Sequence, residues 1–341
     1  MPASPAGNRS TLADSWTGTA LVFRMPDHYQ LRFRDDETFT IVQFTDIHWA
    51  NGGDADLKSR ALMRRIINTE RPDLVILTGD LISSTACHDP LQAIRDAVSI
   101  VEDSRVPWAV VLGNHDSEAG VSREALMEAL REHEFCMACR SASGVTGVGN
   151  YYLTVLDEHA EPAAVLYFLD TGNESPVEHV GGYDWVRRDQ IQWYVTQARA
   201  LAARNGGQPV SAFAFFHIPL PEYQEVWDAG VCYGHRFEAV GCPRVNSGLF
   251  AAMVEMGDVI GTFVGHDHVN DYWGIRHGIR LCYGRASGYN SYGRAGFQRG
   301  ARIIRMRRGT RQFLSWLRLD DGSVIPEQPV HYPTGQQRKG S

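Results

Sequence analysis

The sequence predicts an α/β fold built from two sheets, each flanked by helices. In the first half of the chain, short apolar runs that resemble buried strands alternate with amphipathic stretches of helical period. This β-α-β order is typical of a sheet with crossover helices. A second series of apolar runs predicts a second sheet. We expect one domain over residues 31–330, because polar residues able to carry chemistry recur in both halves. Residues 1–30 and 331–341 are expected to form an extension and a mobile tail.

In the first half, each expected strand ends in polar residues. The expected strands are Phe39–Asp46, Asp73–Asp80 and Val106–Asp116. The expected helices are Asp56–Glu70, Asp89–Asp103 and Ser122–His133.

In the second half, the runs "NYYLTVL" and "AAVLYFLD" predict a hairpin. A long helix over Arg188–Arg204 should end at "NGG", because glycine after a periodic stretch is a helix-stop signal. Two strands, Val210–His217 and Asp258–His266, are expected on either side of a helix over Ser247–Met256. The tail reads as four strands: "HVNDYWGIR", "GIRLCYG", "ARIIRMRR" and "RQFLSWLRL".

Composition excludes several classes of protein. The net charge of −7 without long like-charge runs predicts no nucleic-acid partner. No apolar run approaches the roughly 20 residues of a membrane span, and the first 30 residues lack a signal-peptide pattern. We therefore expect a soluble, cytoplasmic protein. Six cysteines are too few for a disulfide scaffold, and pairing of Cys232 with Cys242 stays open, as does the oligomeric state.

Polar side chains that can bind a metal follow the strands at the points where they end. The carboxyl ends of strands are where open α/β sheets bind ligands. The candidate donors are Asp46, His48, Asp80, Asn114, His217, His266 and His268.

Seven donors are more than one ion uses, since an ion takes about four to six ligands. The set suits two ions about 3.5–4 Å apart that share a carboxylate. Imidazole, carboxylate and amide oxygen without thiolate favour Mn, Fe, Zn or Ni. The sequence therefore predicts a centre of two transition-metal ions, with Mn, Fe, Zn or a mixed pair as candidates.

Each donor alone has an ordinary explanation. The Asp46–His48 pair could arise by chance, and Asp80 could belong to a turn. The "GNHD" stretch could cap a helix, because Asn and Asp are good N-caps. His217 could be a core histidine, and His266 with His268 a surface pair. All of them in one order at strand ends do not arise easily by chance.

The ordered set "D-x-H … GD … GNHD … H … GHDH" resembles the calcineurin-like metallophosphoesterase superfamily. Further stretches, such as "HIPLPEYQEVW" and "CYGRASGYNSYGRAGFQRGARI", resemble the plant and yeast branch of phosphatases related to the purple acid phosphatases. The resemblance implies a four-layer α/β/β/α sandwich of two mixed sheets, with a metal pair at the sheet edge.

The resemblance also implies a role for each donor. Asp46, His48 and His268 would hold the first metal, and Asn114, His217 and His266 the second. Asp80 would bridge the two ions, and His115 would face the substrate phosphate.

One position departs from the purple acid phosphatases. Those enzymes bind ferric iron through a tyrosine three residues after the aspartate of "GD", where this chain has Ser83. His48 would fill the first-metal shell instead, so no iron–tyrosinate chromophore is expected and the identity of the first metal stays open.

The predicted activity is hydrolysis of phosphate monoesters by a hydroxide that bridges the two ions. His115 would protonate the leaving oxygen, and Asp116 would either orient that imidazole or cap the next helix. His235, Arg285 and Tyr292 are weaker candidates for contact with a small phosphorylated substrate, since a loop histidine and a glycine-rich turn have structural explanations too.

Two alternatives to this activity remain open. One is a phosphodiesterase acting on cyclic nucleotides or phospholipid head groups. The other, more remote, is a non-catalytic scaffold with a phosphoesterase fold. Scaffolds of that kind lose metal ligands, whereas this chain keeps all seven.

Overall fold

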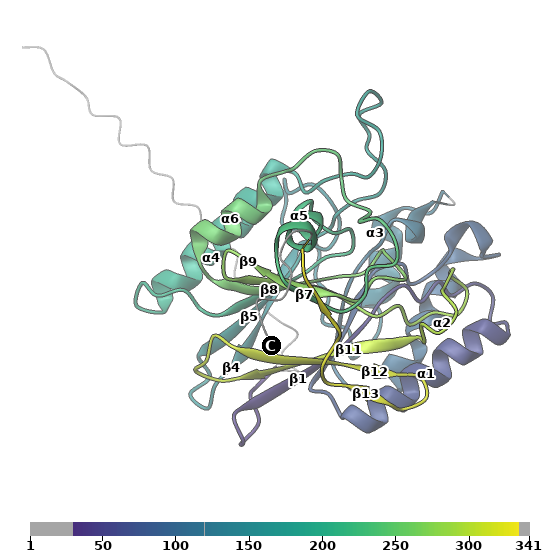
Figure 1. Ribbon diagram of the computed structural model, residues 1–341, viewed down its shortest axis with the longest axis horizontal. Helices are drawn as coiled ribbons and strands as arrows, with labels where there is room; N and C mark the ends of the chain where they lie inside the picture. The colour runs from purple at the N-terminus through teal and green to yellow at the C-terminus, as the bar shows by residue number, and fades with distance from the viewer. Residues whose placement is uncertain (1–29, 119, 334–341) are drawn as a thin grey trace, which may run out of the picture.

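The computed structural model describes residues 30–118 and 120–333, and over these residues it has four layers. Two mixed sheets face each other, and helices cover the outer face of each (Figure 1). The predicted fold, two mixed sheets flanked by helices, is therefore confirmed. The expected extension and tail, residues 1–30 and 331–341, fall mostly outside the described residues.

The first sheet has six strands in the order β13-β12-β11-β1-β2-β3. Its strands are β1 (Thr38–Phe44), β2 (Leu74–Thr78), β3 (Trp108–Val111), β11 (Gly300–Arg307), β12 (Phe313–Leu319) and β13 (Val324–Ile325). Strands β1, β2 and β3 are parallel, and β11 runs antiparallel to β1.

The outer face of this sheet packs against helices from the first half of the chain. These are α1 (Asp54–Glu70), α2 (Pro90–Asp103) and α3 (Arg123–Arg131). Asp89 caps α2 by accepting the amides of Leu91 and Gln92, and Pro90 occupies the first helical position. Ser122 caps α3 in the same way through the amide of Ala125.

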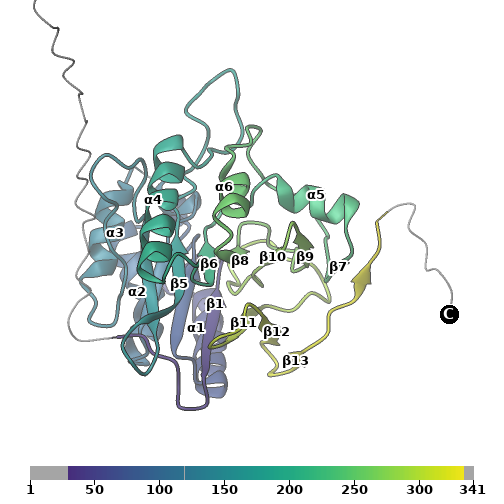
Figure 2. The same ribbon diagram turned by 90° about the vertical axis from the view of Figure 1, so that its left-hand side faces the viewer.

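The second sheet has eight strands in the order β14-β7-β9-β10-β8-β6-β5-β4. Its strands are β4 (Tyr151–Leu156), β5 (Pro162–Phe168), β6 (Ala212–Phe215), β7 (Cys232–Tyr233), β8 (Val259–Val264), β9 (Trp273–Arg276), β10 (Ile279–Tyr283) and β14 (Val330–His331). Strands β5, β6 and β8 are parallel. The helices of this half are α4 (Arg188–Arg204), α5 (Glu222–Ala229) and α6 (Leu249–Met256). Figure 2 shows α5 and α6 above strands β8, β9 and β10. The predicted hairpin is β4 with β5, which pair antiparallel.

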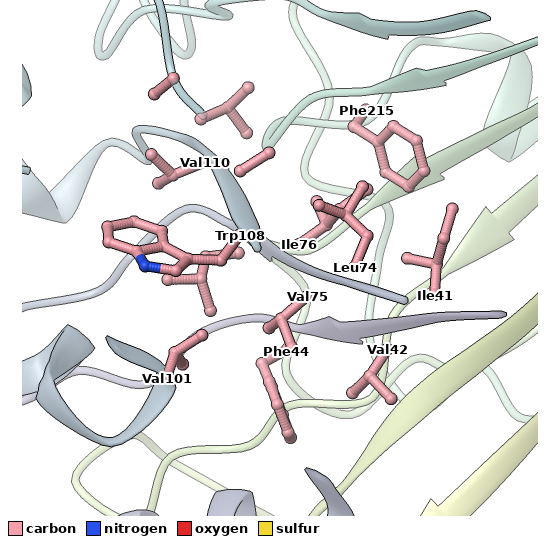
Figure 3. Close-up of a cluster of buried hydrophobic side chains, with 14 of the residues drawn as sticks. Ile41, Val42, Phe44, Leu74, Val75, Ile76, Val101, Trp108, Val110 and Phe215 are labelled. Atoms are coloured by element: carbon pink, nitrogen blue, oxygen red, sulfur yellow. The ribbon is translucent and has the colours of Figure 1, made fainter. Parts of the chain in front are cut away.

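Alternation along each strand divides the apolar side chains between two interfaces. Figure 3 shows Leu74 and Ile76 on the side of Phe215, which comes from the facing sheet, while Val75 lies on the side of Val101 from α2. These side chains are all fully or almost fully buried. The buried strands therefore hold their carboxyl ends rigidly in place.

Two further features bear on the sequence predictions. All six cysteines are free, so Cys232 and Cys242 are not bridged in this structure. Within the described ranges, no helix is both long enough and apolar enough to cross a membrane.

Candidate metal centre

The seven predicted donors lie just beyond the carboxyl ends of five strands. Strands β1, β2 and β3 lead into Asp46 and His48, Asp80, and Asn114. Strands β6 and β8 of the facing sheet lead into His217, and into His266 and His268. The two sheets meet here, because the amide of His266 donates to the carboxylate of Asp46 at 3.0 Å. Parallel pairing therefore brings donors from distant parts of the sequence to one edge.

Four of the donors have a left-handed backbone. The φ angles are 54° at Asp46, 51° at His48, 50° at Asp80 and 75° at His266. Such a conformation is uncommon outside glycine and costs on the order of 1–3 kcal/mol per residue. Strain of this kind persists where the surrounding structure enforces it, and it concentrates at functional sites.

The first cluster combines two carboxylates and two imidazoles. Its members are Asp46, His48, Asp80 and His268, whose candidate ligand atoms lie within 4.8 Å of one another. The Nε2 atoms of His48 and His268 are 3.1 Å apart, and Nε2 of His268 is 3.5 Å from the carboxylate of Asp46. All four side chains are buried.

The second cluster shares Asp80 with the first. Its ligand atoms come from Asp80, His217 and His266. Nδ1 of His266 lies 3.3 Å from Nε2 of His217. The amide oxygen of Asn114 lies 3.2 Å from the same Nε2 atom, which adds an oxygen donor to this cluster.

Asp80 lies between the two clusters. Its Oδ2 atom is 3.1 Å from Nε2 of His217 and 3.6 Å from Nε2 of His48. This oxygen is buried, yet it makes no hydrogen bond of acceptable geometry with any described residue. Buried polar atoms are normally hydrogen-bonded, so a carboxylate oxygen that faces two imidazole nitrogens without a well-aligned hydrogen bond fits a shared metal ligand. The donors present therefore fit a pair of ions bridged by Asp80.

The close approach of two loops explains a glycine beside this site. A Cβ atom on Gly113 would collide with the side chain and the amide of Asp80. Glycine here lets the loop after β3 lie against the loop after β2, and it places Asn114 beside the bridging carboxylate.

The ionisation of two of the imidazole donors suits metal binding. Burial lowers the pKa of His48 to about 4 and, together with the nearby His217, that of His266 to about 3. Both rings are thus neutral at pH 7, with a lone pair free for a metal. At His217, burial opposes protonation, but the charges of Asp80 and Asp46 outweigh it and raise the pKa to about 9, so a metal ion would have to displace a proton there. Burial opposes ionisation of Asp46, but its hydrogen bond and attraction to His268 outweigh this and lower its pKa to about 2.

The family follows from comparison with known proteins. A model of the calcineurin-like phosphoesterase family matches residues 39–270, a span that contains all seven donors. The chain belongs to the calcineurin-like phosphoesterase family.

Relatives from plants and yeast extend the similarity over most of the chain. The probable inactive purple acid phosphatase 29 of Arabidopsis thaliana is 34% identical over 88% of this chain and 87% of its own length. Phosphatase DCR2 of Saccharomyces cerevisiae is 30% identical over 75% of this chain and 49% of its own length, so the match spans about half of that relative.

Solved structures show the same fold. A dimetal phosphatase from Danio rerio superposes with a TM-score of 0.53 at 15% identity, covering 81% of this chain and 98% of that one. Purple acid phosphatase PPD1 from yellow lupin gives a TM-score of 0.51 at 14% identity, covering 85% of this chain and 53% of that one.

Ser83, at the position where the sequence departs from the purple acid phosphatases, contacts a predicted ligand of the first metal. Its hydroxyl lies 3.1 Å from Nδ1 of His48, on the side of the ring opposite the cluster. A partner on the second nitrogen fixes the tautomer and the orientation of a metal-binding histidine. The hydroxyl of Ser83 can thus hold the ring of His48 with its Nε2 atom toward the cluster.

We expect Ser83→Ala to weaken metal binding at the first cluster. Loss of such a supporting partner typically lowers metal affinity about 10–100-fold. Titration of the metal-free protein with Mn²⁺ or Zn²⁺ measures this change, and Ser83→Thr, which keeps the hydroxyl, is the matched control. Equal affinities for the alanine and threonine variants would contradict the role of the hydroxyl.

His115 lies beside the first cluster, and its ring centroid is 5.3 Å from that of His48. Its Nδ1 atom lies 2.9 Å from the carboxylate of Glu118, and its side chain is 41% exposed. Burial opposes protonation, but the charges of Asp80 and Glu118 outweigh it, so the pKa of His115 is raised. The ring can therefore reach both the cluster and solvent.

The expectation that Asp116 orients His115 needs correction. The carboxylate of Asp116 is buried and accepts the amides of Ile82 at 2.9 Å and Gly113 at 2.7 Å. Burial and the charge of Asp80 raise its pKa to about 6. Asp116 thus joins the two loops that carry Asp80 and Asn114, and Glu118 is the carboxylate that contacts the imidazole.

Among the three weaker candidates for substrate contact, Tyr292 lies at the cluster. Its ring stacks on that of His268 with 4.1 Å between centroids, and its hydroxyl donates to Glu238 at 2.6 Å. Tyr292 therefore borders the first cluster, and its contact with substrate stays a prediction.

His235 and Arg285 meet around Asp271 instead. Nδ1 of His235 is 3.4 Å from Asp271, and the guanidinium of Arg285 donates to the same carboxylate at 2.5 Å. Arg285 is 4% exposed and also donates to the carbonyl of Gln298. These contacts give Arg285 a structural role and provide no support for the expected contact with substrate.

Tyr183 is a neighbour of the site that the sequence analysis missed. Its ring packs edge-on against His266 with 4.4 Å between centroids. Tyr183 follows no strand end and belongs to no metal-binding motif, so only the folded loop between β5 and α4 reveals it.

Proposed function

We propose that this protein is a phosphomonoesterase that uses two metal ions. The observation that carries the proposal is the buried Oδ2 atom of Asp80, which belongs to both clusters of donors and faces imidazole nitrogens on both sides without a well-aligned hydrogen bond. One shared carboxylate with imidazoles on both sides is the arrangement that a two-ion phosphatase needs.

Each donor has a place in this proposal. Asp46, His48 and His268 would hold one ion, Asn114, His217 and His266 would hold the other, and Asp80 would contribute to both. When bound, the two ions lower the pKa of a water molecule to near neutrality and offset the charge of the phosphate. Donors without thiolate fit Mn, Fe, Zn or a mixed pair.

Side chains of the protein would protonate the leaving group and contact the organic part of the substrate. Glu118 can accept a hydrogen bond from Nδ1–H of His115, and its negative charge favours the protonated ring. Nε2–H of that ring would donate its proton to the leaving oxygen. The ring of Tyr292 against His268, and that of Tyr183 against His266, flank the two clusters and would contact the organic part of a small phosphorylated substrate.

Some relatives have the word "inactive" in their names, so catalysis by this protein needs a direct test. The seven donors and His115 support an active enzyme, because strained backbone conformations such as those of Asp46, Asp80 and His266 concentrate at functional sites. The cytoplasmic location stays a prediction.

We expect the purified protein, supplied with Mn²⁺, Fe²⁺ or Zn²⁺, to hydrolyse p-nitrophenyl phosphate and to lose this activity with chelator. Restoring the metal should restore the rate, because the ions supply the nucleophile. Bis-p-nitrophenyl phosphate is the matched diester, and the monoester should be the better substrate. A preference for the diester would replace the proposal with a phosphodiesterase, and two bound ions without hydrolysis of either ester would indicate a scaffold.

A further inference from the structure

A cleft separate from the metal centre lies at the opposite end of the strands. It lies between the β9–β10 turn and the β11–β12 turn, and its volume is about 580 Å³. Its wall includes Thr38 at the start of β1 and Ile260 near the start of β8, whereas the metal donors follow the ends of the same two strands. Six residues of strand between Ile260 and His266 span about 20 Å. This cleft is therefore a separate site, in the size range of about 300–1,000 Å³ typical of small-molecule sites.

The wall of the cleft is positively charged in a protein whose net charge is −7. Four arginines line it, Arg280, Arg305, Arg307 and Arg311, and none of its lining residues is acidic. Arg307 faces Glu37 at 3.7 Å. Within residues 30–118 and 120–333, the other three form no ion pair with a carboxylate. Arg305 donates to the hydroxyl of Thr40 at 3.1 Å, and Arg311 donates to the carbonyl of Gly257 at 2.7 Å, so each keeps its positive charge. A concave wall of one charge attracts ions of the opposite charge.

Arg280 is held in place by aromatic rings rather than by an acid. Its guanidinium lies 4.4 Å from the ring centroid of Trp273 and 4.2 Å from that of Phe313, which belongs to the facing sheet. Its one hydrogen bond among the described residues is a long one, 3.4 Å, to the carbonyl of Phe313. A guanidinium carries five N–H donors, so most of those of Arg280 are oriented in advance and free for an anion.

The cleft also has an apolar rim. Ile275 is 56% exposed and Leu314 is 66% exposed, and both belong to its wall together with Phe313. Exposed apolar side chains beside arginines without a carboxylate partner favour a ligand that has both an acidic group and an apolar part. An inorganic anion lacks the apolar part, and a neutral lipid lacks the acidic group.

We propose that this cleft binds a small amphiphilic anion. Its acidic head pairs with the free donors of Arg280, and the neighbouring arginines add positive charge around it. Its apolar body lies along Ile275, Phe313 and Leu314. A fatty carboxylate or an alkyl phosphate has this chemistry, whether free in solution or part of a lipid. The proposal is independent of phosphatase activity, because none of these residues belongs to the metal centre.

Calorimetric titration of the full chain with decanoate tests the proposal, since a carboxylate is no substrate for phosphoester hydrolysis. We expect saturable binding at one site, and weaker or no binding of inorganic phosphate and of decyltrimethylammonium. Arg280→Ala should weaken decanoate binding about 10-fold or more, the scale of a lost charge-assisted hydrogen bond. Arg64→Ala, at an exposed arginine of α1, is the control and should leave binding unchanged.

A second variant guards against misfolding of Arg280→Ala, whose side chain lies between the two sheets. Leu314→Asp changes an exposed residue, so the fold should persist while decanoate binding falls. Leu57→Asp on α1, also an exposed leucine at 51%, is its control. Unchanged binding in the Arg280 and Leu314 variants would overturn the proposal. So would binding to phosphatidic acid vesicles without binding of soluble decanoate, because the cleft would then be a membrane contact.

Discussion

Asp80→Asn is expected to release both metal ions and to lower phosphatase activity more than about 100-fold. Loss of a supporting residue already costs about 10–100-fold in affinity or activity, and Asp80 is proposed to bind both ions directly. Asparagine keeps an oxygen that can accept the amide of His115, which lies 2.8 Å from Oδ1 of Asp80. The loop should therefore stay folded, and the loss should reflect the missing negative charge.

Metal content by mass spectrometry and thermal unfolding by circular dichroism together measure this result. Asp258→Asn is the matched control, because Asp258 is also a buried aspartate, but it bonds Tyr194 at 2.5 Å, away from the metal centre. The control should keep both ions. If Asp80→Asn lost only one ion, the shared position of Asp80 would be wrong, and the centre would be two separate sites.

Much of the fold was predictable because local signals agreed with the final packing. The helix expected over Arg188–Arg204 has these bounds in the structure, since the "NGG" stop signal follows its last turn directly. The strand expected from His268 to Arg276 begins only at Trp273. Residues before it form the loop that carries His268. Asn270 and Asp271 accept the amides of Phe237 and His235 from another loop, so this segment does not join the strand.

The short helix α5 was missed, although its signals were present. Pro221 precedes Glu222–Ala229 and Gly230 follows it, but eight residues are too few for a clear helical period. Its position matters less to the site than the strand ends, which the sequence does reveal through repeated apolar runs followed by Asp, Asn or His.

The hydrogen-bond partners that hold each donor in place could not be predicted, because they come from loops that approach one another only after folding. Ser83 and His48 are 35 residues apart and meet across the ends of β1 and β2. Asp116 is next to His115 in the sequence, yet Glu118 contacts the ring. The backbone amides of Ile82 and Gly113 occupy the carboxylate of Asp116, and no local pattern indicates this.

Within the "GNHD" stretch, Asn114 and His115 are expected to behave differently when each is replaced by alanine. Asn114→Ala should lower metal content and activity together, because its amide oxygen belongs to the second cluster. His115→Ala should keep both ions, since its Nδ1 contacts Glu118 and its backbone amide, which the substitution preserves, bonds Asp80. Activity of His115→Ala should fall about 10²–10⁴-fold, the range for loss of a general acid.

The leaving group distinguishes proton donation by His115 from simple phosphate binding. A nitrophenolate leaves without a proton, whereas an alkoxide needs one, so His115→Ala should affect alkyl phosphates far more than nitrophenyl phosphate. Glu118→Gln should also lower hydrolysis of alkyl phosphates more than hydrolysis of nitrophenyl phosphate, but by a smaller factor. Glutamine can still accept a hydrogen bond from Nδ1 of His115, but it carries no charge. An equal loss for both esters would mean that His115 binds phosphate. Loss of metal from His115→Ala would make the imidazole a ligand, and Asn114 would then have to be reassigned.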